Sequence, residues 1–165
     1  FLNLTECNLF RRSRKRCCRC YRPAKVIVLK SPAELDKMRA AGRIVAETLA
    51  LLKTRIIPGV TTNELNRLAE KECQRHGAKP AFKGYGGFPF AICSSPNEQV
   101  VHGFADDNPL LEGDILSIDF GVLYKGFFGD SAITVAVGKL DDDTERLLIA
   151  TRESLEQAIE KAKTL

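Results

Sequence analysis

The chain has 165 residues, of which 44% are hydrophobic and 28% charged, so it has enough apolar material for one globular domain with a core. This composition excludes a chain that is disordered throughout, and the absence of any run of about 20 apolar residues argues against a membrane-spanning helix. The net charge of +4 arises in residues 1–25, which carry eight Lys or Arg against one Glu; residues 26–165 carry 17 basic and 20 acidic side chains. Because the folded part is mildly acidic, nucleic acid is not the expected partner.

Residues 1–25 form a basic tail that we expect to be disordered or to act in targeting, whereas residues 26–165 belong to the fold. Cys17 and Cys20 have the CxxC spacing and could form a four-thiolate zinc site with Cys7 and Cys18, but no second pair follows at finger-like spacing. The cysteine pattern does not match a secreted disulfide framework, which favours a reducing compartment. The expected location is the cytoplasm, with a plastid or mitochondrion as the alternative if the tail is a transit peptide.

The first helix is predicted to begin at a capping box, in which Ser31 accepts a hydrogen bond from the amide of Glu34 and the Glu34 side chain reaches back. The helix should end before the Pro58-Gly59 pair. Its inward face is expected to contain the apolar or small residues that recur at steps of three and four, namely Leu35, Met38, Gly42, Val45, Leu49 and Leu52.

A second capping box, from Thr61 to Glu64, predicts another helix, which should close at Gly77. His76, directly before that glycine, is interpreted as a residue at the helix C-terminus whose charged form interacts favourably with the negative end of the helix dipole. The inward residues should be Leu65, Leu68, Ala69 and Cys73.

From residue 78 to 138 the sequence changes to short runs of Val, Ile, Phe and Tyr between glycines and prolines, which is typical of strands and turns. The clearest strand pair is Ile115–Val122 with Phe127–Val137. A third helix is expected after Asp141, with one face that contains Leu148, Leu155, Ile159 and Ala162. The pattern of elements predicts an α+β fold.

Two acidic residues in the strand pair are candidates for chemistry. Alternation along Ile115–Val122 places Asp119 on the face opposite the apolar residues. A tight turn at Tyr124-Lys125 would place Asp130 directly opposite Asp119, where two like charges destabilise the sheet unless something compensates.

Three interpretations of this acidic pair compete. The two side chains could be solvated on an exposed sheet, could share a proton as a carboxylate dyad, or could bind one or two divalent cations. Gly121 and Gly129 flank the acids and should open space beside them, which favours a functional site.

A second candidate stretch runs from Gly84 to Phe104 and contains glycines, aromatic residues and one of the two histidines, His102. It could be a looped crossover with aromatic residues in the core and a hydrogen-bonded histidine. The functional alternative is an apolar ligand pocket with a polar donor at its mouth.

The runs GYGGFPFAICSSPNEQVVHGF, LLEGDILSIDFG and GFFGDSAITVAVG, in this order, resemble the type I methionine aminopeptidases of the pita-bread metallopeptidase family. The resemblance extends from about Lys30 to the end of the chain. It implies a pita-bread fold, of which this chain would contain the first pseudo-repeat and the first helix of the second.

By this resemblance, Asp119 and Asp130 are ligands of two divalent metal ions, which could be Co, Mn, Fe, Zn or Ni, and Asp130 bridges both ions. His102 corresponds to a histidine that contacts the substrate, and Tyr85, Phe88 and Cys93 correspond to residues that line the pocket for a methionine side chain, where a polarisable wall suits a thioether. The implied reaction is hydrolytic removal of the initiator methionine from nascent polypeptides whose second residue is small.

The family takes its remaining histidine and glutamate residues from the second repeat, and this sequence lacks those motifs. The catalytic set is therefore incomplete, and the isolated chain is expected to be inactive. The resemblance also implies a monomer and leaves the ribosome as a further partner. The alternatives are an X-Pro aminopeptidase or dipeptidase of the same fold, and a non-catalytic pita-bread protein that binds another macromolecule.

Overall fold

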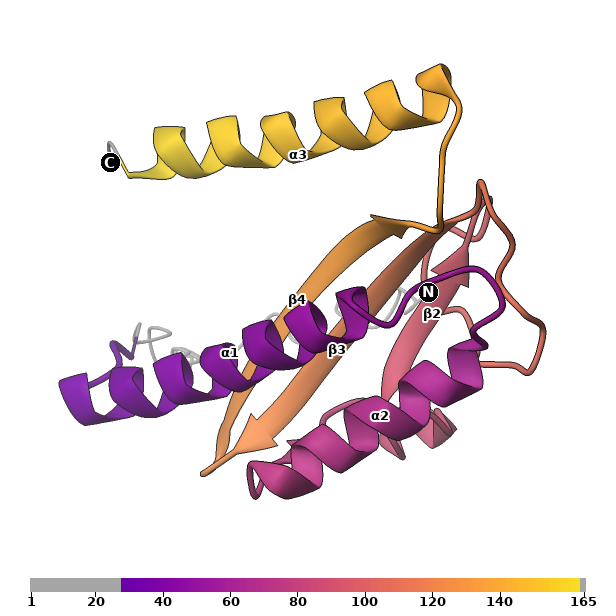
Figure 1. Ribbon diagram of the computed structural model, residues 1–165. Helices are drawn as coiled ribbons and strands as arrows, with labels where there is room; N and C mark the ends of the chain where they lie inside the picture. The colour runs from indigo at the N-terminus through magenta and orange to yellow at the C-terminus, as the bar shows by residue number, and fades with distance from the viewer. Residues whose placement is uncertain (1–27, 164–165) are drawn as a thin grey trace, which may run out of the picture.

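The computed structural model describes residues 28–163 and shows an antiparallel sheet with two helices on one face and a third helix apart from them (Figure 1). The predictions for the tail, including the zinc site, lie outside the described residues. The elements in chain order are α1 Pro32–Lys53, α2 Thr62–Arg75, β1 Lys79–Pro80, the short 3₁₀ helix η1 Tyr85–Gly87, β2 Ile92–Pro96, β3 Ile115–Tyr124, β4 Phe127–Ala136 and α3 Asp142–Ala162.

Both predicted capping boxes are confirmed. The backbone N–H of Ser31 donates to Glu34 Oε2 at 2.8 Å, and the Glu34 N–H donates to Ser31 Oγ at 3.4 Å. At the start of α2 the equivalent distances between Thr61 and Glu64 are 2.9 and 3.2 Å. Each box satisfies backbone donors that the first helical turn would otherwise leave without a partner, which is why the helices begin where the sequence predicted.

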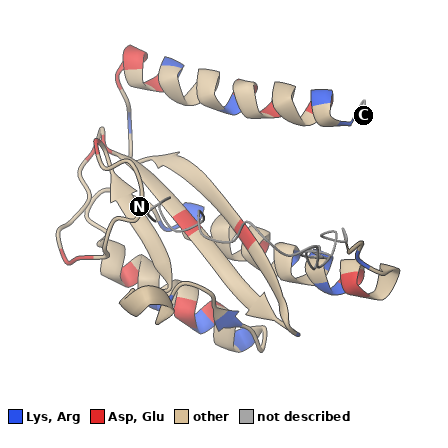
Figure 2. Ribbon diagram, turned by 180° about the vertical axis from the view of Figure 1, so that it is seen from behind, with Lys and Arg blue, Asp and Glu red and all other residues tan. Residues whose placement is uncertain are grey.

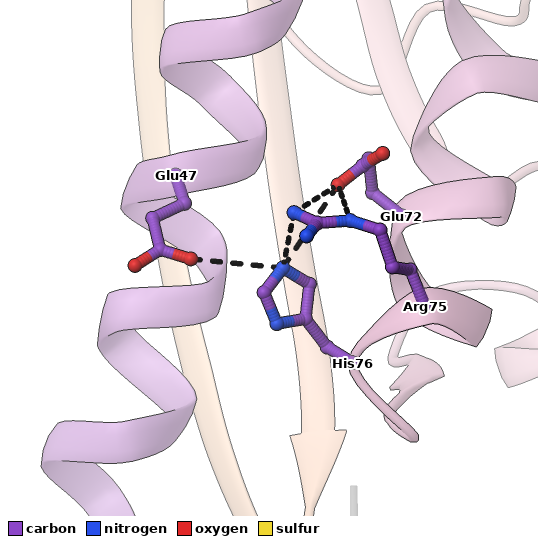
Figure 3. A network of polar contacts seen from close by, with 4 residues as sticks. All are labelled: Glu47, Glu72, Arg75 and His76. Carbon is purple, nitrogen blue, oxygen red and sulfur yellow. Dashed lines mark hydrogen bonds and ion pairs between the residues drawn. The ribbon is translucent and has the colours of Figure 1, made fainter.

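The end of α2 is also where the sequence placed it, with His76 as the C-cap and Gly77 in the left-handed region at a φ of 63°. The ring Nε2 of His76 lies 2.9 Å from a guanidinium nitrogen of Arg75 and 3.6 Å from Glu47 Oε2 on α1 (Figure 3). His76 therefore joins the two helices in addition to ending one of them.

Within the described residues, the sheet has four strands, all antiparallel, with β3 at its centre. β4 pairs with β3 along its whole length on one side, while β1 and β2 pair with different parts of β3 on the other side. The prediction of an α+β fold and of the two long strands is confirmed.

The core lies between the sheet and the pair α1 and α2. On α2, the predicted inward residues are buried or partly buried. On α1 the prediction is wrong for Leu35 and Met38, each 38% exposed, and for Gly42, because α1 approaches β4 with Ala41 facing the sheet. The fully or almost fully buried residues of α1 are Ala41, Ile44, Val45, Thr48, Leu49 and Leu52.

The third helix, α3, forms as predicted, capped by Asp141, whose Oδ1 accepts from the N–H groups of Asp143 and Thr144 at 2.9 Å. It buries no residue, however, and Leu155 is 61% exposed. In Figure 1 it runs apart from the sheet and from the other helices. Among the helices of the described chain, none combines the length and the apolarity that crossing a bilayer requires.

Candidate metal centre

The predicted acidic residues lie on adjacent strands, Asp119 on β3 and Asp130 on β4, and Figure 2 shows acidic positions in red on two strands of the sheet. Side chains along β3 alternate as expected: Leu116, Ile118 and Phe120 are fully buried toward the helices, and Asp119 lies on the other face, partly exposed. We call this second surface the open face. Alternation alone is sufficient to place Asp119 there.

The register of the hairpin differs from the prediction. Asp119 pairs with Ala132, and Asp130 pairs with Gly121, so the two acids are diagonal neighbours and not directly opposite each other. The predicted turn at Tyr124-Lys125 was wrong because a two-residue hairpin turn of this kind needs a positive φ at both central positions. Lys125 and Gly126 provide it, with φ values of 48° and 84°. The turn is displaced by one residue, which shifts the pairing by two, and both acids therefore stay on the same face.

The two carboxylates remain close enough to interact. The pKa of Asp119 is raised to about 6, first by burial and then by the charge of Asp130 and a hydrogen bond with its side chain. The charge of His102 acts in the opposite direction and lowers the pKa of Asp119. Asp119 is thus not an independently solvated side chain.

Cys93 belongs to the same cluster. It pairs directly with Asp119 in the β2–β3 register and is only 6% exposed. Burial raises the pKa of the Cys93 thiol to about 11, and the charges of Asp119 and Asp130 add to the effect. The thiol is therefore protonated near neutral pH and is free of any disulfide.

The interpretation of the two glycines as open space beside the acids is wrong. A Cβ at Gly121 would lie 2.9 Å from the ring of Phe82, so this side of the site is already occupied by an aromatic side chain. Gly129 faces α1, and a Cβ there would lie 2.6 Å from the backbone of Ala41. The absence of a side chain at Gly121 leaves room for the ring of Phe82, and its absence at Gly129 leaves room for the backbone of α1.

His102 is carried by the loop that follows β2. It is exposed and has a φ of 58°, in the left-handed region that few non-glycine residues adopt. The next residue, Gly103, is held against β2 by two hydrogen bonds of 3.0 Å, one from its N–H to Ser95 Oγ and one from the Ser94 N–H to its carbonyl. A Cβ on Gly103 would lie 2.1 Å from the Ser94 carbonyl oxygen, so only glycine allows this close approach.

The aromatic residues do not lie in the core, which was one of the two alternatives for this stretch. Phe88, Phe90 and Phe104 form an edge-to-face trio with ring centroids 5.3 to 6.0 Å apart. Phe104 is 62% exposed, and Tyr85 is 83% exposed on η1. Phe88 is thus part of an aromatic surface, whereas Tyr85 contacts solvent.

Sequence reasoning did not assign roles to Phe82 and Phe104. Phe82 lies against Gly121, which follows Asp119 by two residues on β3. Phe104 completes the aromatic trio. The available signal for Phe104 was Gly103, because a glycine can mark a place where another segment of backbone approaches closely, as Ser94 does here.

The donor chemistry fits a hard divalent cation in part. Carboxylate oxygens are the ligands that such cations prefer, and a cation between Asp119 and Asp130 would convert their repulsion into attraction. Across residues 28–163, however, no group of three or more His, Cys, Asp or Glu side chains is arranged to hold a metal ion. The described chain supplies two carboxylate donors and not a complete coordination sphere.

Comparison with known proteins gives a consistent result. The profile of metallopeptidase family M24 matches residues 36–164. The methionine aminopeptidase of Clostridium perfringens is 50% identical over 137 residues, which cover 83% of this chain and 55% of that protein.

Two solved structures from Thermotoga maritima, a methionine aminopeptidase and an X-Pro aminopeptidase, match this chain to different degrees. The methionine aminopeptidase matches with a TM-score of 0.78 at 43% identity, covering 81% of this chain and 54% of that one. The X-Pro aminopeptidase matches with a TM-score of 0.66 at 24% identity, covering 79% and 36%, a likeness of fold alone. The chain spans about half the length of the curated relatives it matches.

Proposed function

Because the chain belongs to metallopeptidase family M24 and has the pita-bread fold of that family, we propose that it is the N-terminal part of a methionine aminopeptidase. The proposed reaction is hydrolytic removal of the initiator methionine from nascent polypeptides whose second residue is small. The observation that carries the proposal is the interacting set of Cys93, Asp119 and Asp130 on the open face, with His102 acting on the same carboxyl.

In this proposal Asp119 and Asp130 are the residues of this chain that would hold two divalent ions. Their diagonal placement on adjacent strands supports this role, since the two side chains interact strongly enough to raise the pKa of Asp119. When bound, such ions supply a water molecule acidic enough to act as the nucleophile near neutral pH. The candidate ions are Co, Mn, Fe, Zn and Ni.

The substrate would lie on the same face. His102 is proposed to donate a hydrogen bond near the scissile peptide, a role supported by its exposure and by its electrostatic effect on Asp119. Cys93 and Phe88 would contact the methionine side chain, because a protonated thiol and an aromatic edge are apolar and polarisable partners for a thioether. Tyr85, exposed on η1, would cover the pocket from outside.

Two carboxylates do not complete a catalytic centre. We propose that the general base and the remaining ligands come from chain segments that the relatives have beyond the matched half, and that the 165-residue chain alone does not turn over substrate. We further propose that the enzyme is a cytoplasmic monomer that acts on chains as they leave the ribosome.

An X-Pro aminopeptidase or dipeptidase is the alternative within the fold. The higher identity to the methionine aminopeptidase of the same organism favours the first proposal. A non-catalytic binding protein is less well supported because both metal-ligand candidates of this half are present, and Asp119 has a strongly shifted pKa.

A chimera tests the proposal without any assumption about the ends of this chain. Residues 31–163 would replace the matching half of the Clostridium perfringens relative, and the chimera would be supplied with Mn or Co. We expect cleavage of Met-Ala-Ser and no cleavage of an X-Pro peptide. Release of proline peptides, or tight metal binding without any cleavage, would contradict the proposed activity.

The matched control is Asp130→Asn in the same chimera. Loss of this ligand should lower kcat/KM at least about a thousandfold and reduce the metal content from two ions to one or fewer. Unchanged turnover with full metal loading would refute the role given to Asp130.

A further inference from the structure

Residues 83–91, which include the proposed substrate residues Tyr85 and Phe88, have a composition that does not favour one rigid conformation. Between β1 and β2 this segment contains three glycines in the left-handed region, at positions 84, 86 and 87. Its internal backbone bonds, such as the 2.7 Å bond from the Gly84 N–H to the Phe88 carbonyl, fold it into a compact turn. These bonds shape the segment but do not attach it to the rest of the molecule.

Both ends of this segment, residues 83–91, are attached to one face of α2. The buried backbone N–H of Ala91 donates to Asn66 Oδ1 at 2.7 Å, and Lys83 Nζ donates to Glu70 Oε1 at 2.7 Å. Asn66 and Glu70 are one helical turn apart, and the Asn66 amide donates to Glu70 Oε1 at 3.1 Å. Figure 1 shows the segment lying along α2.

The two attachments differ in strength. Ala91 is fully buried and Asn66 is 7% exposed, so removing the Asn66 side chain would leave a buried N–H without an acceptor. The side chain of Lys83 is 47% exposed and that of Glu70 27%, and a solvated ion pair of this kind contributes little. Asn66 is therefore the dominant attachment.

We propose that Asn66 is a positioning residue for the substrate pocket: from the covered side of the sheet, it holds residues 83–91 against α2 and so sets where Phe88 lies relative to Cys93 and Asp119, which the β2–β3 pairing holds together. Asn66 itself does not contact substrate. Its importance for methionine recognition rests on the proposed function, whereas its hold on the segment is a property of the chain by itself.

Amide hydrogen exchange, read by NMR on the full 165-residue chain, tests this hold without any substrate. In Asn66→Ala the Ala91 amide and the hydrogen-bonded amides of Gly84, Tyr85, Gly87 and Phe88 should exchange at least about tenfold faster, while the amides of β3 and β4 keep their rates. The contacts between the rings of Phe88 and Phe104 should weaken in the same spectra. Failure of the proposed enzymatic activity would leave these results unaffected.

Two further variants make the test specific. Asn66→Asp keeps an oxygen acceptor for the Ala91 N–H but replaces the group that donates to Glu70 by a carboxyl, so it should restore part of the protection, and more of it at a pH low enough to protonate one of the two carboxyls. Asn63→Ala is the matched control, since Asn63 lies on the same helix and donates from its side chain to Asp107 Oδ1 at 2.9 Å; it should loosen the loop at residues 106–108 and leave Ala91 unchanged.

Unchanged exchange at Ala91 in Asn66→Ala would overturn the proposal. A uniform acceleration across the whole sheet in both Asn66 variants would also overturn it, because Asn66 would then support the core in general and not the pocket segment.

Discussion

The two faces of the β3–β4 hairpin come from the same strands but have different roles. On the covered face, Ile118 and Phe120 are fully buried under α1 and α2. On the open face, Asp119 and Asp130 stand close together at a cost in electrostatic free energy. The covered face stabilises the sheet, and this stability allows the open face to hold two like charges side by side.

A second contrast lies between α1 and α3, which have 22 and 21 residues and are both capped at the N-terminus. α1 buries six residues and α3 none. A helical pattern therefore specifies an apolar face but does not supply the surface that covers it.

The largest expected effect is on the covered face. Ile118→Ala should lower the free energy of unfolding by about 2–5 kcal/mol, because it removes a fully buried side chain and leaves a cavity. Thr134→Ala, on the open face of the same hairpin, should cost less than about 1 kcal/mol, since its hydroxyl contact with Ser117 is solvent exposed. Urea unfolding of both variants measures the difference, and equal losses would contradict the division into two faces.

The two glycines of the hairpin sharpen the same comparison. Gly129→Ala should cost about 1–3 kcal/mol because the new Cβ meets the backbone of α1, which cannot move without shifting the helix. Gly121→Ala should cost less, because it meets the ring of Phe82, which can turn away. Thermal unfolding ranks the two variants. A larger loss for Gly121→Ala would show that the ring of Phe82 yields less than the backbone of α1.

The acidic pair should make stability depend on pH in a defined direction. Because the pKa of Asp119 in the fold, about 6, is above the ordinary value of 3.8, the folded chain binds this proton more tightly than the unfolded chain. The penalty is present above pH 6 and disappears as the pH falls below about 4. In a chelating buffer at pH 7.5, Asp119→Asn should therefore be more stable than the unaltered chain, by on the order of 1 kcal/mol once partial exposure is discounted.

At pH 4 the difference between Asp119→Asn and the unaltered chain should vanish. Asp36→Asn serves as the control, because the Asp36 side chain is 74% exposed on α1 and should show no comparable gain. A variant Asp119→Asn that is less stable than the unaltered chain at pH 7.5 would contradict the electrostatic cost assigned to the open face.

The smallest expected effect is on α3. Leu155→Ala should change the free energy of unfolding by less than about 0.5 kcal/mol, because the side chain is 61% exposed. Leu49→Ala on α1, where the side chain is 4% exposed, should cost about 2–5 kcal/mol. A loss above about 1 kcal/mol for Leu155→Ala would show that α3 packs against the body in solution.

Much of the fold was predictable because its signals are local. A capping box needs only residues three positions apart, as in Ser31 and Glu34, and a helix end needs one glycine, as at Gly77. Alternation along a strand placed Asp119 and Ile118 on opposite faces. The relative placement of the two acids on one face also followed, since the error in the turn shifted the pairing by an even number of residues.

The details of the site depended on contacts between distant segments. Phe82 lies against Gly121, Gly129 lies against Ala41, and Phe104 joins Phe88 across a loop. The periodicity within one element does not predict such contacts. For this reason the prediction that Gly121 and Gly129 open space beside the acids was wrong. Asp119, Asp130, His102 and Cys93 were identified from the sequence, whereas the positions of Phe82 and Phe104 were not.

The sequence by itself determined the starts of α1 and α2, the end of α2, the two long strands and the face on which Asp119 and Asp130 lie, because these depend on neighbours within one turn of helix or one step of strand; it placed the end of α1 near Pro58, whereas the helix ends at Lys53. Only the tertiary structure decided the hairpin register, the aromatic wall beside Asp119 and the attachment of residues 83–91 to Asn66. The physical reason is that packing joins residues far apart in the chain, and which pairs meet depends on the shapes of whole elements.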